Sequence, residues 1–364
     1  MFIIGCDLHS RFQQIALLDT ASGGMATKAL EHENGEAKKF YAGLKGKALV
    51  GIEATGYTQW FERLLAELGH ELWVGDPAEI RARVVRQQKT DRRDAEHLLD
   101  LLLTDRFPRL WVPSVEERDL RQLLKHRDKL VQMRTSVKNQ LHYLAMSQGV
   151  CRKRKLRSER GRAELQGLSL DTWASRRRGE LLELLDRLQP RIEELEQAVE
   201  EEAEKRPGAV LLMGQKGVGP VTALAFLLTL GPVQRFRNSR KVVSYLGLNP
   251  SEDSSGGRQR LGHISKQGNE MLRWLLVEAG QSAAQFDPEL RRKYQRLKFR
   301  RGAKVAKVAL ARRLAVRLYW LLREASHKAT REAPSEATLE ATGEARATVH
   351  AEASNLGVAV SHVR

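Results

Sequence analysis

Four acidic residues lie where carboxylates could hold metal ions. Asp7 ends the apolar run 2–6, and Glu53 ends the apolar run 48–52. Asp91 and Asp94 lie three residues apart in a polar segment. Two Mg²⁺ ions about 4 Å apart, held by converging carboxylates, can keep the attacking and leaving oxygens of a phosphodiester in line. The four acids therefore indicate metal-dependent cleavage of a phosphodiester.

These acids also have simpler explanations. Asp91 and Asp94 share one face of a helix start, and taken alone they are better explained by capping and by ion pairs with Arg92 or Arg93. Asp7 is harder to explain this way, because a carboxylate at the end of an apolar strand is costly to bury without a cation or hydrogen-bond donors.

A second candidate chemistry lies in the distal half of the chain. Residues 247–257 place several hydroxyl groups in a Gly-containing loop, and Arg258, His263 and Lys266 follow. Serine is a weak nucleophile that needs activation, and nearby basic groups stabilise charge on a phosphoryl group. Without further information, a Ser/Gly loop with no special role is the preferred interpretation.

The charge of the chain predicts a polyanionic partner. Its 364 residues include 62 Lys and Arg against 45 Asp and Glu, a formal net charge of +17. Nucleic acid is the first expectation. The basic cluster 152–162 is denser than solubility requires, and we assign Lys153, Arg154 and Lys155 to contacts with an RNA or DNA backbone.

Cysteine content and hydropathy restrict the remaining classes. Cys6 and Cys151 are the only cysteines, which argues against a disulfide framework and a Cys-rich zinc site. Residues 1–20 lack the basic start and the long apolar stretch of a signal peptide. The sequence also has no run of about 18 apolar residues that could span a bilayer. We expect a cytoplasmic protein with no membrane partner.

The elements that must position the acids alternate between strand and helix patterns. The length and the 41% hydrophobic content predict two globular units and a connector. Three antiparallel strands followed by helix-connected parallel strands predict an α+β fold with a mixed sheet of the RNase H type, in which Asp7 and Glu53 end adjacent strands. The expected strands are 2–7, 12–19, 25–31, 47–53 and 70–75, with helices at 34–44, 57–69 and on either side of Asp91.

The middle of the chain is helical and resembles a coiled coil. Apolar residues recur at steps of four and three from Leu181 to Val199, and a helix at 116–149 is the natural antiparallel partner. Packing within the chain and dimerisation explain this seam about equally well. Pro190 should kink the helix or mark a fresh start.

The distal part begins with a pattern typical of a helix-hairpin-helix. Gly217 and Gly219 form a Gly-X-Gly turn whose backbone N–H groups could approach a phosphate, although a plain helix connection competes with this interpretation. A polar loop is expected at 248–266 and a disordered or marginally helical tail from 326. Helices are expected at 238–246, 267–284, 287–299 and 302–324.

These motifs together resemble a known family. Asp7, the segment 52–56 and the segment 89–95 resemble the RuvC-like Asp-Glu-Asp-Asp domain of insertion sequence one-ten family transposases, which include the Piv-type DNA invertases. The distal blocks resemble the family's second domain, in the same order: 217–223, 245–250, 255–257, 264–269 and 272–273. The expected domains are a RuvC-like DEDD catalytic domain at 1–106, a helical connector with the basic arm at 107–205, a serine-bearing transposase domain at 206–325 and the tail at 326–364.

The resemblance implies a DNA recombinase of an insertion element. In this family the four acids bind Mg²⁺, and a distal serine attacks the DNA backbone to form a covalent phosphoserine intermediate. The matching residue is Ser255, with Ser254 as the adjacent alternative. Covalent attachment conserves the phosphodiester energy, so strands can be rejoined to new partners.

The resemblance also implies nucleic-acid and protein partners. Family members are guided by a noncoding bridge RNA whose loops pair with donor and target double-stranded DNA. They assemble as dimers that pair into tetramers, and the distal domain of one protomer completes the acidic site of another. By position, Gly217, Gly219, Arg258 and Lys266 join the basic arm as expected nucleic-acid contacts. Whether this copy is active is left open.

Two other classes of protein fit the same residues. A RuvC-like Holliday-junction resolvase or metal-dependent nuclease would cut by activated water, and it would tolerate Ser255→Ala. In a non-catalytic nucleic-acid-binding protein, Asp7→Asn would cause no loss of function beyond small changes in affinity.

Overall fold

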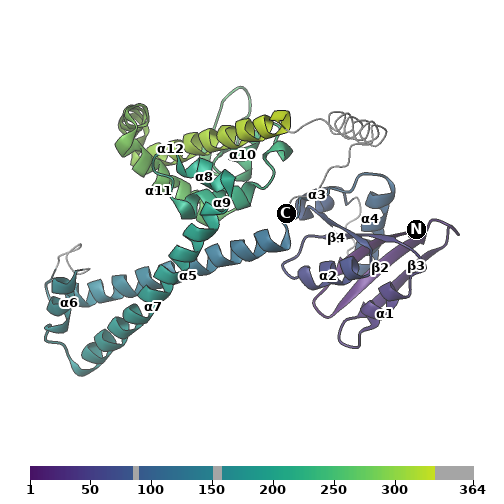
Figure 1. The fold of residues 1–364 in the computed structure, drawn as a ribbon, viewed down its shortest axis with the longest axis horizontal. Helices are drawn as coiled ribbons and strands as arrows, with labels where there is room; N and C mark the ends of the chain where they lie inside the picture. The colour runs from purple at the N-terminus through teal and green to yellow at the C-terminus, as the bar shows by residue number, and fades with distance from the viewer. Residues whose placement is uncertain (85–89, 151–157, 333–364) are drawn as a thin grey trace, which may run out of the picture. The chain divides into compact units, whose positions relative to one another are not determined.

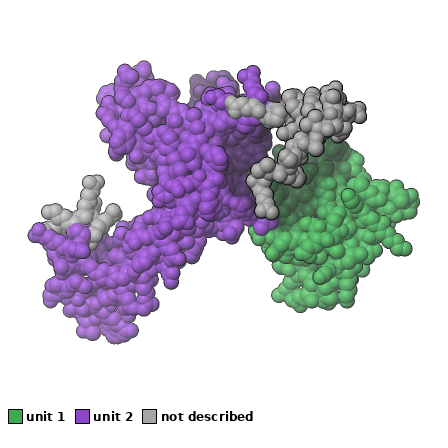
Figure 2. Space-filling model, in the orientation of Figure 1, with its two compact units in different colours: residues 1–113 green, residues 114–364 purple. Residues whose placement is uncertain are grey.

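The chain folds into two compact units. A computed structural model describes residues 1–84, 90–150 and 158–332, and it divides into unit 1, residues 1–113, and unit 2, residues 114–364 (Figure 2). Lys153, Arg154, Lys155 and Cys151 lie outside the described residues. Each unit has its own hydrophobic core, so each is a folding module with its own part of the predicted chemistry.

Unit 1 is built on a five-stranded mixed sheet. The strands lie in the order β3-β2-β1-β4-β5. β1, β2 and β3 pair antiparallel, whereas β4 pairs parallel with both β1 and β5. The mixed sheet predicted from the alternation of apolar residues is confirmed. The strand bounds are β1 (Phe2–Leu8), β2 (Phe12–Asp19), β3 (Met25–Glu31), β4 (Ala48–Glu53) and β5 (Glu71–Gly75).

Helices cover both faces of this sheet (Figure 1). α1 (Glu36–Ala42) and α2 (Gln59–Glu67) pack Tyr41 and Phe61 against the face that carries Ile4 and Ile15. α4 (Asp91–Leu103) packs on the opposite face, and α3 (Pro77–Ala82) precedes it. The central strands β1 and β4 are therefore covered on both faces, and Asp7 and Glu53 lie near their ends.

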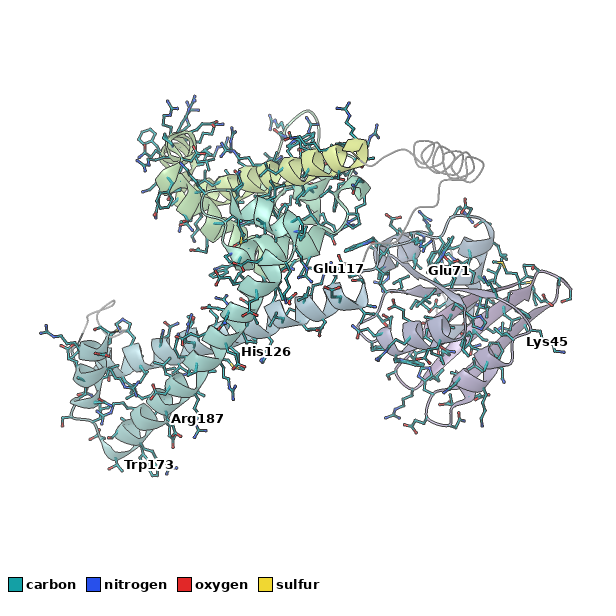
Figure 3. The ribbon with its side chains drawn as sticks, in the orientation of Figure 1. Lys45, Glu71, Glu117, His126, Trp173 and Arg187 are labelled. Atoms are coloured by element: carbon teal, nitrogen blue, oxygen red, sulfur yellow. The ribbon has the colours of Figure 1, made fainter. Side chains whose placement is uncertain are left out.

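Unit 2 begins with a long helical hairpin. α5 (Val115–Ser147) and α7 (Thr172–Glu204) run side by side, with α6 (Glu159–Gln166) between them in the chain (Figure 1). α5 starts with a capping box in which the side chains of Ser114 and Glu117 accept hydrogen bonds from each other's backbone N–H groups. Glu117 is labelled in Figure 3. Arg127 contacts Glu196 and Arg134 contacts Gln189, a register that fits only an antiparallel pair.

The apolar seam of α7 packs within the chain. Leu188 and Ile192 are buried with Val137 and Leu141 of α5. Pro190 lies inside α7, which runs from Thr172 to Glu204, so the fresh helix start that was one of the two outcomes expected there does not occur. Proline removes one backbone hydrogen bond. The burial of Leu188 and Ile192 on either side of Pro190 outweighs that loss.

The rest of unit 2 is a helical body. Its apolar centre is α9, whose residues Leu224 and Phe226 are fully buried. α12 is interrupted at Gly302, where φ is 83°, so it consists of two helical segments close to those expected. The helices are α8 (Pro207–Met213), α9 (Pro220–Leu230), α10 (Ser239–Tyr245), α11 (Glu270–Phe286) and α12 (Pro288–Glu332), with a 3₁₀ turn at Val233–Arg235.

One expectation for the distal region needs correction. The expected loop at 248–266 contains a two-stranded hairpin of β6 (Pro250–Glu252) and β7 (Leu261–Ile264). Residues 326 to 332 form the last turns of α12, and residues 333–364 lie outside the described part. Within the described residues, no helix combines the length and apolarity needed to cross a bilayer.

Candidate active site

The parallel pairing of β1 and β4 sets two of the four acids next to each other. Cys6 pairs with Ile52 in the parallel register, so Asp7 and Glu53 follow at neighbouring positions on adjacent strands. The Asp7 side chain is only 21% exposed, and Glu53 is half-buried. The placement of Asp7 and Glu53 on adjacent strands follows from the strand pattern alone.

Helix α4 supplies the other two acids. Its N-cap is Thr90, whose side chain accepts a hydrogen bond from the backbone N–H of Arg93, and Arg92 pairs with Glu96. The N-cap position therefore belongs to a neutral residue rather than to Asp91 or Asp94. Both acids lie in the first turn, where the helix dipole favours negative charge.

A glycine lets α4 approach the sheet closely. A Cβ atom at Gly5 would lie 2.3 Å from the carbonyl oxygen of Ala95 and 2.3 Å from the amide nitrogen of Leu99. No residue with a side chain fits at that crossing unless the helix moves. Gly5 thus fixes the distance between α4 and β1, and with it the position of the α4 acids above the end of β1.

The acids of the two elements meet around a histidine. His9 Nε2 lies 3.1 Å from Asp7 Oδ2 and 3.6 Å from Asp91 Oδ1. Candidate ligand atoms of Asp7, His9 and Asp91 all lie within 4.8 Å of one another. This role of His9 was not predicted from the sequence. An imidazole two residues beyond the strand-end aspartate is the signal that could have found it.

Electrostatics couple three of the four acids. Burial raises the pKa of Asp7, the charge of His9 acts against this rise, and the negative charges of Asp94 and Asp91 add to it. Burial, together with the charge of Asp7, also raises the pKa of the Cys6 thiol. Cys6 is therefore an inert core residue. Asp7, in contrast, lies in a field that a cation would relieve.

The donor set fits a divalent metal ion. Hard cations such as Mg²⁺ prefer carboxylate oxygens, and a cation would relieve the like-charge repulsion around the partly buried Asp7. Among the described residues, the close group contains Asp7, His9 and Asp91. Glu53 and Asp94 do not belong to that close group. They flank it, Glu53 on the neighbouring strand and Asp94 one helical turn along α4.

The predicted nucleophile lies at the tip of the β6–β7 hairpin. Ser255 and Arg258 form an antiparallel bridge, with the Arg258 N–H donating to the Ser255 carbonyl at 3.1 Å. Gly256 and Gly257 between them have φ values of 58° and 74°, as a tight two-residue hairpin turn requires. Directly opposed residues project on the same face of a hairpin, so the side chains of Ser255 and Arg258 leave the backbone on the same face.

The adjacent Ser254 has a different environment. Its hydroxyl donates to Glu252 Oε1 at 2.7 Å and accepts from the backbone N–H of Arg260 at 3.1 Å. The Ser255 hydroxyl forms no hydrogen bond with any described residue. Ser254 therefore braces the hairpin, whereas Ser255 is exposed at its tip.

Two glycines hold the base of the hairpin together. A Cβ at Gly247 would lie 2.2 Å from the carbonyl oxygen of Gln267, and one at Gly268 would lie 2.3 Å from the carbonyl oxygen of Tyr245. Both have positive φ values. The buried Arg273 donates to the carbonyl of Gln267. The distal motifs thus join the two ends of the hairpin and present its tip.

The other predicted contacts are scattered over unit 2. A Cβ at Gly217 would lie 2.5 Å from the backbone of Ala283 in α11, which gives this glycine a packing role. Gly219 is exposed and caps α9. Lys266 is exposed and has a φ of 56°. The acids belong to unit 1 and Ser255 belongs to unit 2.

Comparison with known proteins agrees with these motifs. Residues 209–295 match the family model "Transposase IS116/IS110/IS902 family", and residues 4–146 match a DEDD transposase model. The chain is 31% identical to a probable family 20 transposase of Pseudomonas aeruginosa over 333 residues, which cover 88% of this chain and 96% of that protein. The chain belongs to the IS116/IS110/IS902 transposase family. This membership confirms the resemblance drawn from the motifs.

Other relatives extend the family assignment. A transposase for insertion sequence element IS1111A of Coxiella burnetii is 26% identical, with 77% of each chain covered. A transposase for insertion sequence element IS1328 of Yersinia enterocolitica is 27% identical over 63% of this chain and 69% of that protein. As a DEDD transposase of an insertion sequence, the protein acts on DNA and uses a divalent metal ion.

Proposed function

We propose that this transposase cuts and exchanges DNA strands through a serine–DNA intermediate at a site completed by the acidic cluster. The observation that supports this most directly is the convergence of Asp7 and Asp91 around His9 at the end of β1. In the RuvC-like arrangement that we infer for unit 1, this end of the sheet receives the scissile phosphate.

We assign the metal ligands to the four acids. Asp7, Glu53, Asp91 and Asp94 hold Mg²⁺, which supplies a positive charge against the scissile phosphate and aligns the oxygens of the displacement. The raised pKa of Asp7 supports this assignment, because a neighbouring cation relieves the repulsion that raises it. His9 hydrogen-bonds Asp7 and orients its carboxylate.

The nucleophile is Ser255. Its Oγ forms a bond to phosphorus while the bond from phosphorus to one bridging oxygen breaks, and the serine proton is transferred so that the departing strand leaves with a hydroxyl. One phosphodiester is thereby replaced by one phosphoserine ester, and the reverse step joins a new strand. Both serines are exposed, and the hydrogen bonds that occupy the Ser254 hydroxyl support Ser255 over Ser254.

Arg258 is the group that we assign to the phosphoryl charge. It lies directly across the hairpin from Ser255, so a phosphate attacked by the hydroxyl would also be within reach of the guanidinium. A guanidinium can donate two parallel hydrogen bonds to phosphate oxygens. The Gly256-Gly257 turn keeps this pairing at the tip.

The assembly and its guide are inferred from the family resemblance. We propose that the hairpin of one protomer serves the acidic cluster of another in dimers and tetramers. We further propose that a bridge RNA selects donor and target sites while the protein contacts backbone and shape. The location of the acids and the serine in separate units is compatible with such a composite site.

Site variants in a strand-transfer assay test the chemistry. The wild-type protein is incubated with Mg²⁺, double-stranded DNA and the RNA that co-purifies with it, and cleavage is compared among Asp7→Asn, Ser255→Ala and Ser254→Ala. We expect cleavage to be abolished in the first two variants and retained in the third. An active Ser255→Ala variant would favour a resolvase-like reaction with water. Sequencing the co-purified RNA tests guidance directly.

A further inference from the structure

Helix α12 carries an unusual charge. From residue 290 to residue 323 the sequence contains 13 Lys and Arg and no Asp or Glu. A solvated helix face usually mixes both signs, because opposite charges four residues apart stabilise the helix. A basic stretch on a folded helix lacks the stabilisation that opposite charges four residues apart provide. Such a stretch therefore indicates a binding function.

The first segment of α12 divides into two faces. Leu290 and Tyr294 pack against Ala283 and Ala284 of α11, which fixes the buried face. Arg292, Arg296, Phe299 and Arg300 follow the spacing i, i+4, i+7 and i+8, so they share the face directed away from that contact. We refer to these four residues as the α12 face.

The α12 face is exposed and lacks carboxylates. Its three arginines are all exposed, and none forms an ion pair with a residue that the structure describes. Nearby cations differ, since Lys293 and Arg313 pair with Glu289. Glu289 thus forms ion pairs with cations beside the α12 face, and the three arginines of the face remain available to bind phosphates.

Phe299 distinguishes this face from an ordinary solubilising one. Its side chain is 94% exposed, the largest fraction among the large apolar side chains that the structure describes. An aromatic ring in water has an unfavourable free energy that a solubilising surface avoids. Nucleic-acid-binding surfaces combine guanidinium groups for phosphates with an apolar group for a base or sugar.

We propose that the α12 face is a docking surface for duplex DNA, with Arg292, Arg296 and Arg300 on phosphates and Phe299 against a base edge or sugar. From Arg292 to Arg300 the helix rises about 12 Å, a length over which a duplex presents about seven phosphate charges. The major groove of B-DNA admits an α-helix, whereas the deep groove of duplex RNA does not. The proposal rests on the DNA substrate of the family and is independent of the serine chemistry.

Binding of the full-length protein to a labelled 30-base-pair duplex tests the proposal. Fluorescence anisotropy is measured in EDTA, so that no strand is cut, from about 50 to 200 mM salt. For Arg292→Gln/Arg296→Gln/Arg300→Gln we expect at least a tenfold loss of affinity at low salt and a decrease of about 2–3 in the slope of log K against log salt. Phe299→Ala should weaken binding several-fold with little change in that slope.

The matched control removes the same charge elsewhere in unit 2. Arg176, Arg187 and Arg191 on α7 are exposed and paired with Glu180, Glu183 and Glu194, and Arg187 is labelled in Figure 3. Their triple Gln variant should keep the wild-type salt slope. Equal slopes for the two triple variants would overturn the proposal. It would equally be overturned if the α12 variant lost affinity for single-stranded RNA while its affinity for the duplex stayed unchanged. Circular dichroism verifies that each variant is folded.

Discussion

Asp7→Asn should stabilise the metal-free protein while it destroys activity. The raised pKa of Asp7 means that folded unit 1 holds this proton more tightly than the unfolded chain does. Stability is therefore lost as the pH rises through that pKa, and at neutral pH the ionised Asp7 destabilises the fold. Asparagine keeps the shape and a hydrogen-bond acceptor for His9 but removes the charge.

Burial is the main cause of the raised pKa of Asp7, the charge of His9 acts against it, and the spacing of the cluster sets the like-charge repulsion that adds to it. Candidate ligand atoms of Asp7 and Asp91 lie within 4.8 Å of each other. Two unit charges at that separation repel by about 3.5 kcal/mol at an effective dielectric of 20 and by about 0.9 kcal/mol in water. Asp91 is 49% exposed, so the value near the water limit applies. We expect a gain of about 1 kcal/mol, a rise of about 3–5 °C in the unfolding temperature of a unit of this size.

Thermal unfolding, measured with EDTA and again with Mg²⁺, tests both the expected gain in stability without metal and the expected loss of stabilisation by metal. Mg²⁺ at ten times its Kd should stabilise the wild-type protein by about 1.4 kcal/mol and Asp7→Asn by much less. Asp105→Asn is the matched control, because Asp105 is an exposed acid beyond the opposite end of α4. It should leave both unfolding temperatures unchanged. An Asp7→Asn protein that is less stable than wild type in EDTA would refute the electrostatic reasoning.

Four further outcomes are expected. Ser255→Ala should abolish strand transfer in a gel assay while Ser254→Ala retains it at reduced rate through a looser hairpin; equal loss in both would contradict the assignment. A mixture of Asp7→Asn and Ser255→Ala proteins should recover part of the activity, because one composite site per mixed dimer is intact, whereas a site within one protomer gives none. Gly5→Ala should cost unit 1 at least about 1–3 kcal/mol in urea unfolding by overpacking, and a neutral effect would contradict the close α4 crossing. Asp287 pairs with Arg317 and caps α12, which lowers the pKa of Asp287 to about 2. Its contribution to the free energy of unfolding is present above the ordinary pKa of an aspartate and is lost as the pH falls towards 2. Asp287→Ala should therefore cost about 1–2 kcal/mol of stability at pH 7 and little at pH 2, as measured by urea unfolding.

Much of unit 1 follows from the sequence because its strands alternate regularly. Buried Ile4 and Cys6 face one side of β1, and the parallel register with β4 then brings Asp7 beside Glu53. The role of His9 did not follow, because it depends on α4 crossing β1 at a glycine. That crossing is a tertiary contact with no periodic signal in the sequence.

In unit 2, some elements could not be predicted from the pattern of apolar residues in the sequence. The hairpin at 250–264 was missed because its strands are short and mostly exposed, so no apolar alternation marks them. The fresh helix start considered at Pro190 does not occur, because packing of α7 on α5 outweighs local propensity. A break between helices at 287–299 and 302–324 was expected, and the structure places it at Gly302, which adopts a positive φ.

Mass spectrometry of the protein–DNA adduct tests the central claim most directly. The wild-type protein is incubated with Mg²⁺, its co-purified RNA and a nicked DNA substrate that traps the first strand cut, then digested to peptides. We predict one nucleotide-modified peptide, with the DNA phosphate on the Ser255 hydroxyl, and its absence in Asp7→Asn. Efficient strand exchange by wild-type protein with no adduct, or with the adduct on another residue, would contradict the account.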